Sequence, residues 1–222
     1  MRNLREQRIH AAEYSGGISS APIYQHALSL CQVLQGDLLE FGAGKGLFVQ
    51  ELLKLPWPGS ITCADLLSRP EILPEKIRWI QADLNDPVPL PDHSFDVIIC
   101  METIAHLENP RFLFREFSRL LRPGGTLLLT MPNQESLRAF TALVTGGHFS
   151  AFRGIAYPAL ITALVRLDFE RICEETGFTS PAFSYTNSGL MPKLHLSWQS
   201  LSLGLLKGRL FSDNLAFVAR KI

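Results

Sequence analysis

The sequence lacks an excess of charge of either sign. Its 222 residues contain 21 Lys and Arg against 21 Asp and Glu, so the formal net charge is zero. Proteins that bind nucleic-acid backbones carry a basic field, which is missing here. No run approaches the roughly 18 uninterrupted apolar residues of a membrane-spanning helix, and the N-terminal residues lack the apolar segment of a signal peptide. We therefore expect a soluble, cytoplasmic protein with no nucleic-acid partner and no integral membrane association.

Cysteine is also scarce. The four residues, Cys31, Cys63, Cys100 and Cys173, are far apart, and no two form a Cys-x-x-Cys pair. Three of them lie in apolar stretches, as reduced thiols of a protein core do. This pattern argues against a disulfide framework and against a cysteine metal site. The chain is long enough to bury one sizeable core, so we expect a single domain.

Strand and helix patterns alternate from about residue 25 to residue 131. The clearest helix begins at Asn109-Pro110, an N-cap followed by proline at the first helical position, and ends at the Arg-Pro-Gly-Gly sequence of residues 122–125. The alternation predicts a doubly wound α/β sheet that binds ligands at the carboxyl ends of its strands. Its strands are expected to be buried on both faces, because five runs of strand length are largely apolar: 37–41, 60–64, 77–81, 95–100 and 126–131.

Residues 132–222 are less regular. We expect Asp168 to cap a helix over residues 169–176, and strands near residues 183–185 and over residues 214–221. One further apolar set recurs at helical spacing and predicts a helix face that packs on the sheet, or alternatively docks on a membrane or a hydrophobic substrate; its members are Leu194, Trp198, Leu201 and Leu205.

The most informative motif is a glycine-rich turn that follows the first apolar run. Glu40 is followed by Gly42, Gly44 and Gly46 in a Gly-x-Gly-x-Gly spacing. Glycine tolerates positive φ and has no Cβ, so this backbone can bend sharply and contact a ligand directly. The dinucleotide fingerprint would place its third glycine one residue later, at Leu47. The spacing therefore opposes an NAD(P)-dependent oxidoreductase, which we keep as an alternative.

Two acidic residues follow the second and third apolar runs, residues 60–64 and 77–81. Asp65 lies about 20 residues after Gly46, the separation at which a strand-end carboxylate meets ribose hydroxyls; alternatively, it only caps the next turn. Asp83, in a Gln-Ala-Asp-Leu sequence, is placed to accept the exocyclic amino group of an adenine, or is a simple turn residue. Together with the glycine turn, these acids indicate a nucleoside-bearing ligand.

At these positions the sequence resembles the class I S-adenosylmethionine-dependent methyltransferases. The resemblance extends to two further segments. They are the Arg-Pro-Gly-Gly turn within residues 120–128 and the final Ala-Phe-Val-Ala-Arg-Lys of residues 216–221. The resemblance implies a Rossmann-like, mostly parallel seven-stranded sheet with an antiparallel last strand and a small substrate-covering region. We expect one methyltransferase domain: residues 1–30 form an N-terminal helical cap, residues 30–131 bind the cofactor, and residues 132–222 supply the substrate side and the last strands.

The resemblance also implies roles for individual residues toward the cofactor, S-adenosyl-L-methionine. Glu40 and the backbone at Met101 would lie at its methionyl end. The three glycines would let the loop wrap its methionine and ribose portions, and Asp65 would hold the ribose hydroxyls. Leu66 would pack on the adenine. Asp83 and Leu84 would bind the polar edge of the adenine ring.

The best candidate for a catalytic base is His106, because it follows the fourth apolar run and histidine titrates near neutral pH. A structural histidine, or a wall of the substrate pocket, is the alternative. The segment 101–107 is similar to a loop of ubiquinone-biosynthesis O-methyltransferases that is associated with a divalent metal. Glu102 and His106 match that loop, but Ala105 replaces its second acid, and we predict no metal.

The acceptor is the least defined part of the prediction. The aromatic and apolar character of residues 140–160 and 194–211 indicates a small, apolar or amphipathic molecule, methylated on oxygen, and leaves peripheral membrane contact open. A methyltransferase-like protein that binds without turnover is a second alternative. Arg2, Arg5 and Arg8 are expected on a solvated helical face, unless the N-terminal helix closes over the cofactor.

Overall fold

The computed structural model describes residues 3–222 except residues 193 and 195. Within this part of the chain, seven strands form one sheet in the order β3-β2-β1-β4-β5-β7-β6. Strands β1 to β5 pair in parallel, whereas β7 runs antiparallel to β5 and to β6. The predicted Rossmann-like α/β fold is therefore confirmed. The strands are β1 (Leu38–Phe41), β2 (Ile61–Asp65), β3 (Arg78–Gln81), β4 (Phe95–Met101), β5 (Leu121–Pro132), β6 (Ala182–Tyr185) and β7 (Asn214–Arg220).

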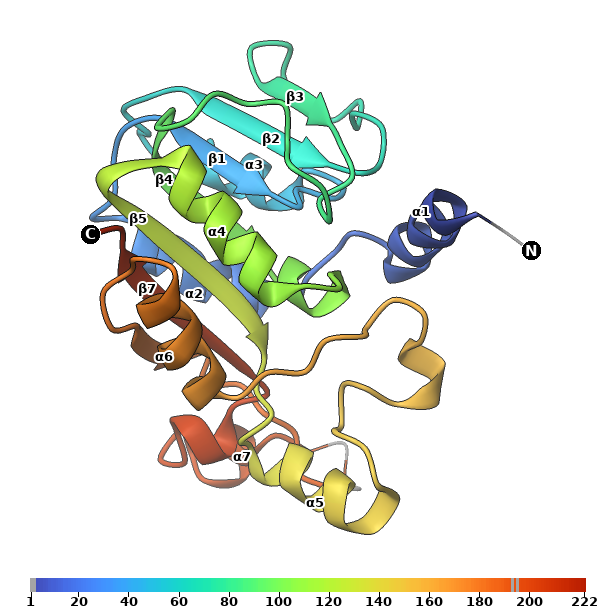
Figure 1. The fold of residues 1–222 in the computed structure, drawn as a ribbon. Helices are drawn as coiled ribbons and strands as arrows, with labels where there is room; N and C mark the ends of the chain where they lie inside the picture. Colours follow the sequence, from blue (N-terminus) through green and yellow to red (C-terminus); the bar gives the residue numbers. More distant parts are fainter. Residues whose placement is uncertain (1–2, 193, 195) are drawn as a thin grey trace.

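Helices cover both faces of the sheet (Figure 1). Helices α2 (Ala21–Cys31) and α3 (Leu47–Leu52) pack on one face, and α4 (Pro110–Leu120) and α6 (Arg166–Glu175) on the other. The sheet thus separates two apolar layers, as in a doubly wound fold. The remaining elements lie beyond the sheet or follow its strands: α1 (Leu4–Ser15), α5 (Leu137–Gly146), α7 (Trp198–Leu201) and the 3₁₀ turns η1 (Thr103–His106), η2 (Gly154–Ala156) and η3 (Arg209–Phe211).

Helix α4 shows how local sequence and packing agree. The Asn109 side chain accepts a hydrogen bond from the Phe112 N–H at 3.0 Å, and Pro110 occupies the first turn, as predicted. Its inward face is aromatic: Phe114 lies 5.8 Å from Phe117 and 6.1 Å from Phe217 of β7, measured between ring centroids. Aromatic burial of this kind stabilises the contact between the helix and the sheet.

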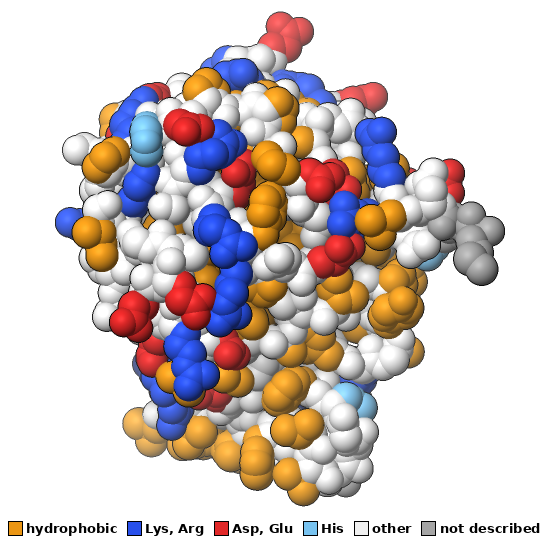
Figure 2. All heavy atoms as spheres, in the orientation of Figure 1, with side chains coloured by type: hydrophobic (Ala, Val, Ile, Leu, Met, Phe, Trp, Pro, Cys, Tyr) orange, Lys and Arg blue, Asp and Glu red, His pale blue; other side chains and the backbone are white. Residues whose placement is uncertain are grey.

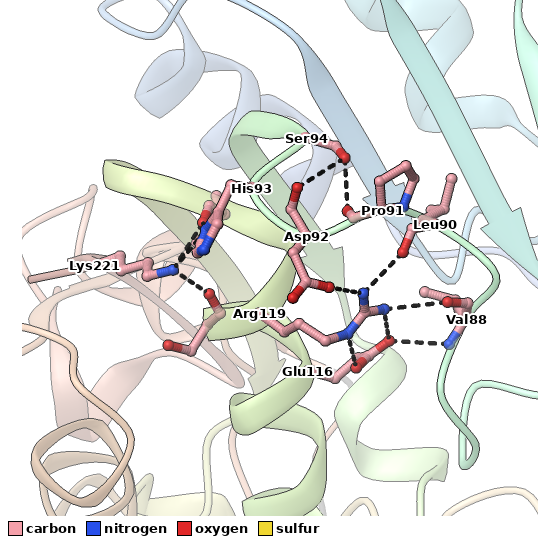
Figure 3. A network of polar contacts seen from close by, with 11 residues as sticks. Val88, Leu90, Pro91, Asp92, His93, Ser94, Glu116, Arg119 and Lys221 are labelled. Atoms are coloured by element: carbon pink, nitrogen blue, oxygen red, sulfur yellow. Dashed lines mark hydrogen bonds and ion pairs between the residues drawn. The ribbon is translucent and has the colours of Figure 1, made fainter.

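A polar network anchors the start of β4 to α4 (Figure 3). The Arg119 guanidinium donates to both carboxylate oxygens of Glu116, at 2.8 and 2.7 Å, and to Asp92 at 2.6 Å. Glu116 is buried, and it also accepts the Val88 N–H at 2.9 Å. Because this carboxylate is paired on both oxygens, its burial is compensated. The network lies at the amino end of β4. The carboxyl ends of the strands are lined by other residues.

Two predictions about the C-terminal third are wrong in detail. Helix α6 begins at Arg166, and Asp168 lies inside its first turn, where it accepts the Val165 N–H at 3.0 Å. The predicted stripe over residues 194–205 is not one helix, because α7 ends at Leu201 and the chain turns through left-handed conformations at Leu203 and Gly204. Its members Leu194, Leu201 and Leu205 are exposed rather than packed on the sheet; residue 195 of this stretch lies outside the described residues.

The N-terminal region divides differently from the expected cap of residues 1–30. Helix α2 belongs to the core, with Ile23, Ala27 and Cys31 buried against the sheet. Helix α1 has no buried residue and stands away from the sheet (Figure 1). Only α1 therefore has the position of a cap. None of the helices in the described residues has the length and apolar character needed to cross a membrane.

Candidate active site

A cavity of about 240 Å³ lies at the carboxyl ends of β1, β2 and β4, under α1. Parallel α/β sheets bind ligands at this edge. The residues predicted as the site converge here, although they are spread over most of the first half of the chain. Gly46 is the exception and does not line the cavity. The lining members are Glu40, Gly42, Gly44, Asp65, Leu66, Asp83, Leu84, Met101 and His106.

The glycine turn is packed tightly against the protein itself. A Cβ on Gly42 would lie 2.0 Å from the Thr103 hydroxyl oxygen, and one on Gly44 would lie 2.6 Å from the Gly17 carbonyl oxygen. Both glycines have positive φ, so any side chain there would also strain the backbone. Gly46 is the N-cap of α3, and a Cβ there would collide with the Leu73 side chain. The turn therefore accepts no side chain at these three positions, and at Gly42 and Gly44 it forms a cradle of bare backbone at the cavity wall.

Asp65 is held rigidly at the wall of this cradle. Its carboxylate accepts the Gly44 N–H at 2.7 Å and the Leu67 N–H at 2.9 Å, one on each oxygen. Burial raises the pKa of this carboxyl, and the backbone hydrogen bonds oppose that shift. A carboxylate oxygen can accept more than one hydrogen bond, so Asp65 shapes the loop and retains acceptor capacity toward the cavity.

Glu40 places a second carboxyl in the cavity wall. It is 1 % exposed, and burial, together with the charge of Asp65, raises its pKa well above the usual range. The Cys63 thiol at 4.0 Å is a weak partner. A positively charged ligand in the cavity would favour the ionised carboxylate. The backbone cradle and this buried carboxyl therefore fit a cationic, nucleoside-bearing group such as S-adenosylmethionine.

Asp83 is engaged by a residue that we expected to be solvated. The Arg8 guanidinium of α1 donates to Asp83 at 2.9 Å and to both carboxylate oxygens of Glu108, at 2.9 and 2.8 Å. The other Asp83 oxygen accepts the Asn85 N–H at 3.0 Å. An adenine amino group would thus share Asp83 with protein donors. Arg8 instead ties α1 across the cavity; Arg5 is exposed as expected, and Arg2 lies outside the described residues.

His106 is oriented by the segment that covers it. Its Nδ1 lies 2.7 Å from the Ala159 carbonyl oxygen. Because a carbonyl only accepts, Nδ1 carries the proton and the Nε2 lone pair is left available. Burial lowers the pKa of the imidazole, while the Ala159 hydrogen bond and the charge of Asp65 raise it. A neutral imidazole with one fixed tautomer is suited to accepting a proton.

A second cavity of about 430 Å³, more open to solvent than the first, adjoins it. Its walls come from the end of α1, the start of α2 and the covering segment around residues 156–160, and they are mainly apolar. The two cavities share five residues, which form the wall where their contents would meet: Ser15, Ile18, Ser19, Glu102 and His106.

Several lining residues were not predicted from sequence. Tyr24 accepts the Ser19 N–H at 3.0 Å, and burial raises the pKa of its phenol. Glu102 was noted only for its place in a metal-associated loop, and Asn214 was seen only as the start of a strand. In the part of the chain that the structure describes, no three His, Cys, Asp or Glu side chains form a group that could hold a metal ion.

Comparison with known proteins agrees with this geometry. A family model described as Methyltransferase domain matches residues 39–129. The ubiquinone biosynthesis O-methyltransferase of Xanthomonas oryzae pv. oryzae is 28% identical over 124 residues, 51% of this chain and 50% of that protein. The tRNA N(3)-cytidine methyltransferase METTL2 of Danio rerio is 36% identical over 107 residues, 41% of this chain and 30% of that protein. The matched region thus spans half or less of these curated relatives.

A solved structure extends the likeness to the whole fold. A methyltransferase from Thermotoga maritima, described as S-adenosylmethionine-dependent and as a possible histamine N-methyltransferase, superposes with a TM-score of 0.65. The match covers 98% of this chain and 94% of that one at 17% identity. At this identity the likeness concerns the fold. The matched part includes α1 and the segment around residue 159, which lie outside residues 39–129 of the family model.

Proposed function

We propose that this chain, a class I S-adenosylmethionine-dependent methyltransferase by its domain and fold, transfers a methyl group to oxygen on a small, apolar or amphipathic acceptor. The observation that carries the proposal is the pair of adjoining cavities. One is lined by the carboxyl ends of the strands and suits the cofactor; the other is mainly apolar and suits an acceptor. Glu102 and His106 lie in the wall between them.

The cofactor, S-adenosylmethionine, supplies when bound a methyl group on a positively charged sulfur. The chain's own residues would hold and orient it. Glu40 would offer a buried carboxylate to the cationic end, and Asp65 would accept the ribose hydroxyls from its fixed position. The wall at Gly42 and Gly44 would admit the ligand close to the backbone. These contacts align the reactants, which is a large part of catalysis for such transfers.

His106 would take the proton that the acceptor hydroxyl loses. Its Nε2 is free of the Ala159 hydrogen bond that holds Nδ1, and it lies in the shared wall. The covering segment that supplies Ala159 also donates the N–H groups of Ile161 and Thr162 to the Ala105 carbonyl, at 2.9 and 3.1 Å. Closure of the site and orientation of the base therefore depend on the same segment.

Charge supports a small molecule rather than a nucleic acid as the acceptor. The net charge is zero, and the cavity walls are acidic at Glu40, Asp65 and Glu102. Arg8, the arginine that lines the first cavity, is already paired with carboxylates. Nucleic-acid binding depends on neutralising phosphates with free cationic side chains.

Calorimetry with S-adenosylmethionine tests the cofactor assignment, and release of S-adenosylhomocysteine across a panel of acceptors tests turnover. We expect cofactor binding, no binding of NAD(P), and turnover with hydroxylated small molecules but not with tRNA. Absence of cofactor binding would overturn the proposal. Turnover confined to tRNA would overturn the acceptor class, and binding without any turnover would favour a non-catalytic protein.

A further inference from the structure

Glu102 has an unusual backbone for its position. It follows β4 directly and adopts φ 57°, ψ −7°, in the left-handed region. Its N–H donates to the Thr130 carbonyl and hydroxyl oxygens, both at 3.0 Å. A non-glycine residue in this region costs of order 1 kcal/mol or more, and such strain gathers at functional sites. The hydrogen bonds to β5 hold the residue in this conformation at the wall between the two cavities.

The Glu102 carboxyl is only half satisfied. Its Oε2 accepts the Asn214 side-chain N–H at 2.9 Å. Its Oε1 is buried and has no hydrogen-bond partner among the described residues. Burial raises the pKa of this carboxyl to about 7, although Thr130 and Asn214 oppose the shift. A buried acceptor without a donor is costly, whereas a ligand that brings a donor would remove that cost.

We propose, on the basis of the function assigned above, that Glu102 binds the methyl acceptor by accepting a hydrogen bond from its hydroxyl or amine group. Glu102 lies in the wall common to both cavities, beside His106. Asn214 is a positioning residue, since its amide holds the far oxygen. Glu102 thereby selects acceptors that carry a donor, and it selects neutral or cationic molecules over anionic ones.

The surroundings of Glu102 reinforce this selection. Two ionisable groups interact electrostatically with Glu102, Tyr24 from α2 and Cys100 from β4. Glu40 from β1 and His106 from η1 line the same cavity. The partners from β5 and β7, Thr130 and Asn214, are uncharged. A carboxylate or phosphate on the acceptor would therefore find no cation to pair with among these residues, and it would be repelled by Glu102 once that carboxyl ionises.

Three matched phenols test the selection: 4-methylphenol, which is neutral, tyramine, which is a cation, and 4-hydroxyphenylacetate, which is an anion. Their binding is measured by calorimetry with S-adenosylhomocysteine present. We expect tyramine to bind wild-type protein at least about tenfold more tightly than 4-hydroxyphenylacetate. Glu102→Gln, which keeps the shape of the side chain, should reduce this ratio to about twofold or less. Glu175→Gln is the matched control, because Glu175 is exposed and pairs with Arg111 far from the site.

The pH dependence separates Glu102 from His106. Tyramine binding should strengthen as pH rises through about 7 and Glu102 ionises. This dependence should disappear in Glu102→Gln and persist in His106→Gln, while Asn214→Ser should move it to higher pH. An unchanged ratio in Glu102→Gln, or no binding of any of the three phenols by wild-type protein, would overturn the proposal. If wild-type protein does not bind S-adenosylhomocysteine, the proposed function itself fails, and the two failures are thus distinguishable.

Discussion

The strand-end half of the site and its covering half are built in different ways. At the ends of β1 and β2, Glu40 and Asp65 are buried, and the glycine turn is so closely packed that Gly42 and Gly44 have no room for a side chain. The cover consists of α1, which has no buried residue, and of the segment around residue 159. Hydrogen bonds of Arg8 and Tyr14 from α1, and of the Ala159 carbonyl, link the cover to itself and to the site. We infer that the first half provides a preformed site and that the second controls access and orientation.

The surface of the molecule is divided in its own way between charged and apolar regions. Charged side chains of both signs mark the face over α4 and α6, whereas apolar side chains gather at the end of the molecule that carries α5 and α7 (Figure 2). The exposed apolar residues of this end are Phe140, Leu143, Val144, Leu201, Leu203 and Leu205. This apolar end thus lies apart from both halves of the site. The predictions below test the contrast between the preformed half and the cover.

The largest effect is expected in the preformed half. Asp65→Ala removes the acceptor for the Gly44 and Leu67 N–H groups and the proposed partner of the ribose. Hydrogen bonds to a charged group contribute about 1.5–3 kcal/mol each, so affinity for S-adenosylhomocysteine should fall by about 100-fold or more. Calorimetry measures the loss, and Asp86→Asn, an exposed acid near the rim, serves as control. Unchanged affinity in Asp65→Ala would contradict a preformed ribose site.

The next effect concerns the proton acceptor that the cover orients. His106→Gln should lower kcat by about 100-fold, the usual contribution of a general base, and leave cofactor affinity within about twofold. In the wild-type protein, burial lowers the pKa of His106, so activity that depends on the neutral imidazole should be lost only below pH 6.5. Initial rates against pH measure both features. The control is His10→Gln on the exposed face of α1; equal losses in the two variants would exclude a base at position 106.

A smaller effect is expected on stability, through Glu102. Its pKa is about 7 in the folded protein against an ordinary 4.5, so the folded state binds this proton more tightly than the unfolded chain does. The resulting stability is fully present below pH 4.5 and is lost as pH rises through 7. The Glu102→Gln side chain does not ionise and so avoids this loss. The free energy of unfolding of the variant, relative to that of wild type, should therefore rise by about 1–2 kcal/mol from pH 5 to pH 8. Denaturant unfolding at both pH values measures the gain, and a constant difference would contradict the raised pKa.

The smallest effect tests the attachment of the cover. Arg8→Gln breaks the bridge from α1 to Asp83 and Glu108. Partly exposed ion pairs of this kind contribute about 1 kcal/mol, so S-adenosylhomocysteine should dissociate about fivefold faster with little change in global stability. Stopped-flow dissociation provides the measurement. Arg5→Gln, on the exposed face of the same helix, should dissociate at the wild-type rate, and a similar acceleration in both variants would exclude a specific bridge.

The preformed half could be predicted from the sequence, because its signals are local. The turn Gly42 to Gly46 and the acids at the ends of β2 and β3 are short motifs attached to strands, and the sheet brings strand ends together. The antiparallel β7 was also predicted and is confirmed. The residues that converge on the cavity are therefore those whose neighbours in sequence define their place in the fold. Their individual roles toward the cofactor stay predictions.

The covering half could not be predicted in the same way, because its contacts join residues far apart in the sequence. Arg8 meets Asp83 and Glu108, and Asn214 meets Glu102; no spacing rule signals such pairs. The apolar repeat through Leu201 and Leu205 has helical spacing, yet the left-handed turn after α7 interrupts it. Periodicity could not reveal that turn, since Leu203 gives no local signal for positive φ.

We propose that cofactor and acceptor occupy adjoining cavities that meet at Glu102 and His106. A crystal structure with S-adenosylhomocysteine bound is the decisive measurement. We expect the adenosine to lie between Asp65 and Asp83, with the sulfur at the wall that carries Glu102 and His106. Adenosine in the second cavity, or a sulfur turned away from this wall, would contradict it.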